Sequence, residues 1–102
     1  MKDAAKYPVA VVGAGKIGQM ITRFLVGTGD YQVKLIDQDT KALAAFAPAT
    51  RVEFTQVDVQ KKGELEKALK GQLAVVNATP YYLTERIATA AKKAGVHYLD
   101  LT

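Results

Sequence analysis

The sequence predicts an α/β domain with a doubly wound parallel sheet, five strands in the order 3-2-1-4-5 and helices on both faces. Three observations predict it. Short apolar runs alternate with amphipathic stretches along the 102 residues. The first run leads into glycines with the spacing G-x-G-x-x-G, at Gly13, Gly15 and Gly18. The second run ends on an acidic residue, Asp37, nineteen residues after Gly18.

The first β–α unit begins with residues 9–12, a β-branched run typical of a strand buried on both faces. Gly13 permits a tight turn, Gly15 has no Cβ to hold a phosphate away from the backbone, and Gly18 allows close helix–strand packing. The following helix is amphipathic, and its N-terminus offers unpaired N–H groups to an anion. Its apolar stripe is Ile17, Met20, Ile21, Phe24 and Leu25.

This turn is the first candidate binding site. We expect a diphosphate to lie against the residues Gly13, Ala14, Gly15, Lys16, Ile17 and Gly18. The alternative is that the glycines only make a tight connection and bind nothing. Three correctly spaced glycines followed by a correctly placed acid exceed what a connection alone requires.

The next two strands flank a short helix. Residues 31–36 read as the second strand, and 41–47 as a helix that buries Phe46. Residues 51–57 alternate well enough for a third strand, with Val57 among its inward side chains.

The second half of the chain continues the alternation. Residues 63–70 form a helix with an apolar stripe, and 73–76 form a continuous apolar run that suits a central strand. Pro80 is placed in the first turn of the next helix, which Gly95 ends. Residues 96–99 make the fifth strand and leave an open edge, at which self-association into a homo-oligomer can occur.

Size and composition predict one domain over residues 1–102 with no membrane or nucleic-acid partner. Hydrophobic residues make up 49% of the chain, but no apolar run approaches the ~20 residues that span a bilayer. The first seven residues are too short and polar for a signal peptide, and cysteine is absent. The net charge of +4 comes from lysines mixed with glutamates on predicted helices, without interleaved aromatics. A soluble cytoplasmic protein is the expectation.

The residue at the end of the second strand indicates the cofactor. Asp37 can accept hydrogen bonds from the adenosine ribose diol, and its carboxylate would repel a 2′-phosphate, so the sequence favours NAD over NADP. Lys41 is close enough in sequence to offer a compensating cation, and NADP therefore remains open.

Further candidate contacts follow the third and fourth strands. Asp58 can accept from the adenine amino group while the Val59 N–H reaches a ring nitrogen; alternatively, Asp58 caps the following helix. Small residues after the fourth strand let the backbone run along the cofactor, although they also suit a plain turn. They are Asn77, Ala78, Thr79 and Pro80.

No catalytic residue is assigned. His97 is the only histidine, lies in the predicted fifth strand and reads as structural. Tyr81 and Tyr82 are followed four positions later by Glu85 and Arg86, so the activating lysine of a Tyr-x-x-x-Lys pair is missing. No His, Cys, Asp and Glu set predicts a metal site.

Three stretches give the chain a family resemblance. They are Leu-Glu-Lys-Ala-Leu-Lys-Gly at 65–71, Val-Val-Asn-Ala-Thr-Pro at 75–80, and Ala-Ala-Lys-Lys-Ala-Gly-Val-His-Tyr-Leu-Asp-Leu-Thr at 90–102. With the opening glycine motif, the chain resembles the N-terminal NAD(P)-binding Rossmann domain of the saccharopine dehydrogenase-like family, from Pro8 onwards.

The resemblance implies a pyridine-nucleotide-dependent oxidoreductase that acts on a carbon–nitrogen bond of an amino-acid-derived substrate. Family members continue into a second domain that binds substrate and mediates dimerisation. The chain is therefore expected to be a cofactor domain of a longer enzyme, binding cofactor without turnover. The resemblance also implies that Asp100 and Thr102 lie near the nicotinamide or the substrate.

A nucleotide-sensing regulatory domain, like those that gate potassium uptake, is the rival interpretation. Such domains combine G-x-G-x-x-G with a strand that ends in Asp-x-Asp, and Asp37 and Asp39 form that pattern here. The stretch 77–102 resembles the saccharopine group far better and favours the enzyme.

Overall fold

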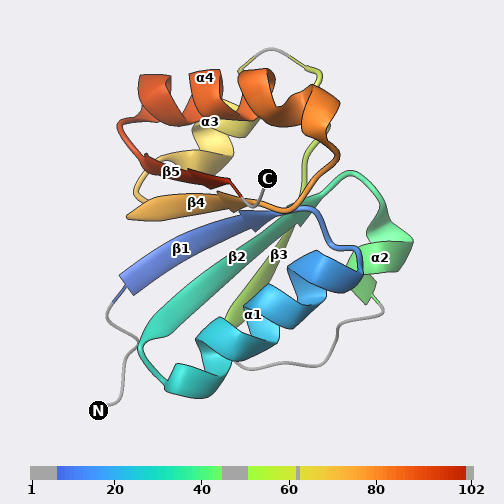
Figure 1. Ribbon diagram of the computed structural model, residues 1–102, viewed down its shortest axis with the longest axis vertical. Helices are drawn as coiled ribbons and strands as arrows, with labels where there is room; N and C mark the ends of the chain where they lie inside the picture. Colours follow the sequence, from blue (N-terminus) through green and yellow to red (C-terminus); the bar gives the residue numbers. More distant parts are fainter. Residues whose placement is uncertain (1–6, 45–50, 62, 101–102) are drawn as a thin grey trace.

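Five parallel strands lie side by side in the order β3-β2-β1-β4-β5 (Figure 1). The computed structural model describes residues 7–44, 51–61 and 63–100. The predicted fold class, strand order and parallel direction are confirmed. The strands are β1 (Tyr7–Val12), β2 (Tyr31–Asp37), β3 (Val52–Gln56), β4 (Ala74–Asn77) and β5 (His97–Asp100).

The helices cover both faces of the sheet, as predicted. Figure 1 shows α1 (Lys16–Thr28) and α2 (Thr40–Ala44) on one side. On the other side lie α3 (Glu64–Leu69) and α4 (Thr84–Ala94), the latter preceded by the 3₁₀ turn η1 (Tyr81–Leu83). Within the described ranges, no helix is long and apolar enough to cross a membrane.

Two apolar clusters, one on each face, hold these layers together. Successive strand residues point to opposite faces, so the three inner strands β1, β2 and β4 supply both clusters. The cluster under α1 and α2 contains Val11, Ala14, Val33 and Leu35, with Ile21, Leu25, Val26 and Ala42 from the helices. The cluster under α3 and α4 contains Ala10, Val12, Ile36 and Val75, with Leu65, Ala68, Leu69, Ile87, Ala90 and Ala91 from the helices.

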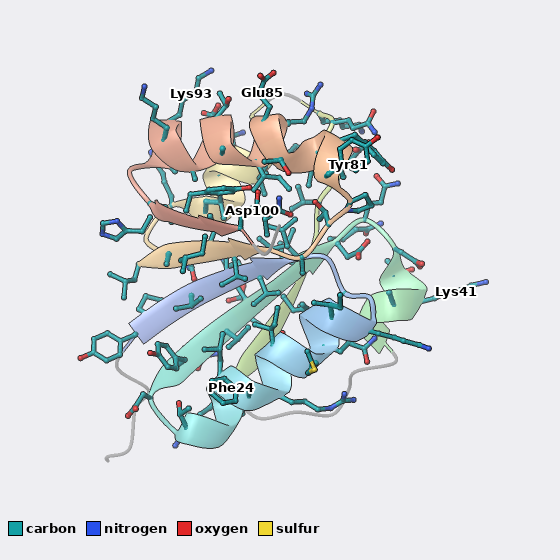
Figure 2. All side chains as sticks on the ribbon, viewed as in Figure 1. Phe24, Lys41, Tyr81, Glu85, Lys93 and Asp100 are labelled. Carbon is teal, nitrogen blue, oxygen red and sulfur yellow. The ribbon has the colours of Figure 1, made fainter. Side chains whose placement is uncertain are left out.

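The apolar stripe predicted for α1 coincides only in part with its packed face, since Ile21 and Leu25 join the cluster and the other three residues do not. Phe24 is labelled on α1 in Figure 2. Ile17, Met20 and Phe24 are 54%, 61% and 71% exposed, while Gly18 and Thr22 are buried. The reason is the contact at Gly18, whose missing side chain brings the helix against the turn that follows β1. Because each helical residue turns by about 100°, this contact rotates the packed face by about one residue from the apolar stripe.

Other expectations are corrected in detail. Pro80 precedes η1 instead of lying in the first turn of α4. Val57 is buried as predicted, but it lies beyond the end of β3 and joins the cluster under α3 and α4. His97 is exposed at the amino end of β5, opposite the carboxyl ends of the strands. Phe46 lies outside the described residues.

Candidate functional site

A cavity of about 320 Å³ opens where the carboxyl ends of the strands meet the loops that follow them. Neighbouring strands β1 and β4 continue into helices on opposite faces of the sheet, which creates a crevice between them. The lining consists of Val12, Gly13, Gly15, Ile36, Asp37, Gln38, Val57, Asp58, Val59, Gln60, Ala78, Thr79, Pro80, Tyr82 and Leu83.

The glycine-rich turn forms one wall of this crevice. Gly13 has a φ of +107°, and a Cβ there would lie 2.7 Å from the Ala78 carbonyl oxygen. A Cβ on Gly18 would collide with the carbonyl oxygen of Gly13. A Cβ on Gly15, by contrast, meets nothing within 4 Å. Gly13 and Gly18 are therefore required by packing, whereas Gly15 leaves open a space into which a side chain would project.

The N-terminus of α1 supplies hydrogen-bond donors beside Gly15. The Gln19 N–H makes the first helical hydrogen bond, to the Gly15 carbonyl oxygen at 2.9 Å. The N–H groups of Lys16, Ile17 and Gly18 precede that bond and belong to the first turn, where helices have no internal acceptors. With the helix dipole they favour an anion.

Asp37 is held by two backbone groups. Its Oδ2 accepts the Ala14 N–H at 2.8 Å, and its Oδ1 accepts the Asp39 N–H at 2.9 Å. The Gln19 side-chain amide also donates to the Ala14 carbonyl oxygen at 2.8 Å. Ala14 is thus fixed on both sides, and Asp37 both lines the crevice and orients the glycine-rich turn.

Asp58 makes a local turn after β3. Its Oδ1 accepts the Gln60 N–H at 2.9 Å, and its carbonyl oxygen accepts the Lys61 N–H at 2.9 Å. The alternative role as a cap of α3 is not observed, because Gly63 occupies that position without a side-chain bond. Arg86 of α4 donates to the Gln60 carbonyl oxygen at 3.2 Å and joins the loop to the helix.

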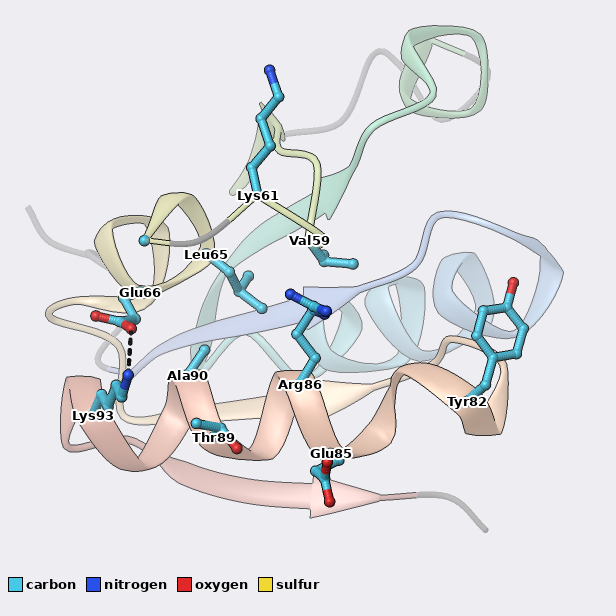
Figure 3. A pocket seen from close by; sticks show the side chains of 11 residues that line it. Val59, Lys61, Leu65, Glu66, Tyr82, Glu85, Arg86, Thr89, Ala90 and Lys93 are labelled. Atoms are coloured by element: carbon cyan, nitrogen blue, oxygen red, sulfur yellow. Dashed lines mark ion pairs between the residues drawn. The ribbon is translucent and has the colours of Figure 1, made fainter.

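A second cavity of about 360 Å³ lies between α3 and α4 (Figure 3). It shares Val59 and Tyr82 with the crevice but contains no residue of the glycine-rich turn. Across it, the Lys93 ammonium lies 3.7 Å from a Glu66 carboxylate oxygen. Because both side chains are substantially exposed, this pair contributes little to stability.

Asn77 lies beneath the crevice wall instead of in its lining. It is 2% exposed, and its side-chain oxygen accepts the backbone N–H of Thr79 at 2.9 Å and the Thr79 hydroxyl at 2.6 Å. Its amide nitrogen donates to the Tyr98 hydroxyl at 3.0 Å. The Tyr98 hydroxyl in turn donates to an Asp100 carboxylate oxygen at 3.0 Å.

The structure brings most of the predicted site residues together. The crevice lining includes Gly13, Gly15, Asp37, Asp58, Val59, Ala78, Thr79 and Pro80. Five others are close in sequence but do not line it; they are Ala14, Lys16, Ile17, Gly18 and Asn77.

Sequence reasoning missed seven lining residues: the apolar residues Val12, Ile36 and Val57 at the ends of strand regions, and Gln38, Gln60, Tyr82 and Leu83. Gln38 and Gln60 come shortly after the predicted site residues Asp37 and Asp58, and this position in the sequence could have indicated them. The 3₁₀ turn brings Tyr82 and Leu83 to the crevice, which no periodicity indicated.

Together the sheet order, the glycine-rich turn and the crevice define a Rossmann-like α/β domain. The chain belongs to the family described as the saccharopine dehydrogenase NADP binding domain, whose model matches residues 9–102. The predicted resemblance is therefore confirmed.

Solved structures of low sequence identity share the fold. Apo saccharopine dehydrogenase (L-Glu forming) from Saccharomyces cerevisiae is 19% identical with a TM-score of 0.85, and the match covers 94% of this chain and 22% of that enzyme. This chain thus spans less than a quarter of the yeast enzyme.

Two other matches carry different cofactors in their structures. A wide-type short-chain dehydrogenase/reductase from Veillonella parvula in complex with NADP is 20% identical with a TM-score of 0.75, covering 95% of this chain and 47% of that one. The Bordetella bronchiseptica enzyme WbmG in complex with NAD and UDP is 21% identical with a TM-score of 0.71, covering 94% and 37%. At such identity these matches establish only the fold.

Proposed function

We propose that this chain binds a nicotinamide adenine dinucleotide in the crevice between β1 and β4. The observation that carries the proposal is Gly15, where a Cβ would project into open space beside the first turn of α1. Packing does not require a glycine there, but close approach of a diphosphate does. Membership of an NADP binding domain family supports the same assignment.

The remaining contacts follow from the lining of the crevice. The diphosphate lies against Gly13 and Gly15, at the N-terminus of α1, and the adenosine ribose lies beside Asp37. Adenine lies near Asp58 and Val59, and the segment 78–80 borders the other half of the cofactor. The bound cofactor would supply hydride transfer, while the chain orients it and excludes water.

The choice between NAD and NADP depends on the surroundings of Asp37. The family description favours NADP. The Asp37 carboxylate disfavours a 2′-phosphate, but it is engaged by two backbone N–H groups, and Lys41 extends from neighbouring α2 (Figure 2). We therefore propose that both dinucleotides bind in the crevice, and the ratio of their dissociation constants is a quantity that calorimetry measures.

We further propose that the chain is the cofactor domain of an oxidoreductase acting on a carbon–nitrogen bond of an amino-acid-derived substrate. The supporting observations are the family and the 22% share of the yeast enzyme that the chain spans. Because the resemblance places the substrate-binding residues of such an enzyme in a second domain, we expect this chain to bind cofactor without turnover. The same proposal includes a cytoplasmic location for the protein and self-association through the open edge of β5.

Titration calorimetry with NAD⁺ and NADP⁺ tests the proposal. Binding with a millimolar or tighter dissociation constant is expected for at least one of them, and Gly15→Val is the matched control that should bind neither. Absence of heat with both dinucleotides in a folded protein would refute cofactor binding. Steady oxidation of NADH or NADPH with lysine-type or saccharopine-type substrates would refute the expected lack of turnover.

The nucleotide-sensing alternative predicts the same cofactor binding but a different protein context. Its supporting pattern, Asp37 with Asp39, has a structural explanation here, because Asp39 Oδ1 accepts the Lys41 N–H at 2.9 Å at the start of α2. The family match over residues 9–102 favours the enzyme.

A further inference from the structure

A directed chain of hydrogen bonds crosses the carboxyl ends of β4 and β5. Asn77 takes part in four of them, two through its oxygen to Thr79 and two through its nitrogen, to Tyr98 at 3.0 Å and to Thr84 at 3.4 Å. Two acceptor and two donor positions are the full capacity of an amide side chain. The amide is therefore saturated by protein groups, at 2% exposure.

The direction of the chain is fixed by one backbone group. The Thr79 N–H can only donate, so the Asn77 oxygen must face it and the Asn77 nitrogen must face Tyr98. The Tyr98 hydroxyl consequently accepts from Asn77. Its own proton is then directed to the Asp100 carboxylate.

One end of the chain lies in the crevice wall. Thr79 lines the crevice, and its methyl carbon would be 3.3 Å from a Cβ on Gly13. The adjacent Ala78 N–H donates to the Val12 carbonyl oxygen at 2.9 Å and extends the sheet by one bond. The next backbone donor in the chain is the Thr79 N–H, and its acceptor is the Asn77 side-chain oxygen.

We propose that Asn77 and Tyr98 are positioning residues: the Tyr98 hydroxyl anchors the nitrogen end of the Asn77 amide, and the amide oxygen holds Thr79 at the spacing that a bound dinucleotide requires. The inference rests on the proposed cofactor binding, but it assigns affinity to residues that do not line the crevice. Without the Tyr98 hydroxyl, the Asn77 nitrogen keeps only its 3.4 Å contact with Thr84. Such a long contact anchors the nitrogen end only weakly, so the amide oxygen is held less firmly against Thr79.

The first test is Tyr98→Phe, which keeps the ring and its packing. We expect dinucleotide affinity to fall about threefold to tenfold, the usual effect of one neutral hydrogen bond. By NMR hydrogen exchange, the Thr79 amide should exchange faster while the Ala78 amide keeps its protection. Tyr31→Phe is the matched control, since Tyr31 is also partly buried but lies at the amino end of β2. It should change neither quantity.

A double-mutant cycle tests whether Tyr98 acts through Asn77. Asn77→Ala should lower affinity at least as much as Tyr98→Phe, and the double variant should be no weaker than Asn77→Ala alone. Additive losses would overturn the proposal, as would unchanged Thr79 exchange in Tyr98→Phe. Because Tyr98→Phe preserves packing, its result stands even if Asn77→Ala fails to fold.

The exchange measurement also separates this inference from the proposed function. If the wild-type protein binds neither dinucleotide, the proposed function fails, while the Thr79 and Ala78 amides still report whether Tyr98 anchors Asn77. If the wild type binds and both exchange and affinity are unaffected by Tyr98→Phe, only the positioning role fails.

Discussion

Replacing Asp37 by alanine should destabilise the protein before any cofactor is added. A residue that only contacts ribose could be removed from the free protein at little cost. Here, however, Asp37 accepts the N–H of Ala14, a fully buried residue, across 23 positions of sequence. Asp37→Ala leaves that donor without its partner.

The size of the effect follows from the burial of each donor. An unsatisfied buried N–H costs about 1–3 kcal/mol, and for a domain of this size each kcal/mol lowers the melting temperature by about 4–8 °C. The second donor, the Asp39 N–H, is in an exposed segment, where water can replace the carboxylate. Nearly all of the loss should therefore arise at Ala14.

Thermal unfolding of the cofactor-free protein provides the assay, with Asp58→Ala as the matched control. Asp58 also ends a strand region and accepts a backbone N–H, but that of the exposed Gln60, so its loss should cost much less. In calorimetry, Asp37→Ala should weaken NAD⁺ and NADP⁺ together, because the glycine-rich turn loosens for both. An unchanged melting temperature with a gain in NADP⁺ affinity would refute this reasoning and leave Asp37 as a ribose contact alone.

Further predictions concern the glycines and Tyr98. Gly15→Val should abolish dinucleotide binding in calorimetry, while the melting temperature measured by circular dichroism stays near that of the wild type. Gly27 lies in an equally open position of α1, and Gly27→Ala should add about 0.5–1 kcal/mol of stability and leave binding unchanged. Gly18→Ala should lower stability by at least about 1–3 kcal/mol in urea unfolding, because its Cβ collides with the Gly13 carbonyl oxygen; wild-type stability would contradict the packing described. Burial raises the pKa of Tyr98 above its ordinary value of 10.0. The hydrogen bond from Asn77 lowers this pKa, and the hydrogen bond to Asp100 raises it. The associated stability is complete below pH ~10 and is lost as pH rises through the higher folded-state pKa, so urea midpoints should fall more steeply above pH 10 in the wild type than in Tyr98→Phe.

The alternation of apolar runs was sufficient to predict the sheet. The first and fourth strands are short unbroken apolar runs, the third alternates, and each helix has its own stop signal, so element type and order could be read locally. The strand order followed from the glycine-rich turn, because that turn occurs at the first strand of a doubly wound sheet. The predicted contacts at Gly13, Asp37 and Ala78 lie in one crevice for the same reason: the carboxyl ends of parallel strands share one edge.

The packed face of α1 could not be obtained in this way. Periodicity identifies apolar residues that share a side of a helix, but the side that packs is chosen by the closest contact. That contact is between Gly18 and Gly13, and glycine contributes nothing to an apolar stripe. Ile17 and Phe24 are consequently exposed although the pattern includes them.

Polar residues at strand ends present a related problem, which hydrogen-bond capacity resolves. Asp37 and Asn77 are the last residues of β2 and β4, and from the sequence both are candidate ligand contacts. A carboxylate has about four acceptor sites, so after accepting two N–H groups Asp37 can still accept from a ribose hydroxyl. An amide has two acceptor sites and two donors, and all four of Asn77 are used within the protein. Asp37 can therefore combine a structural role with ligand contact, whereas Asn77 affects a ligand only through the residues that it holds.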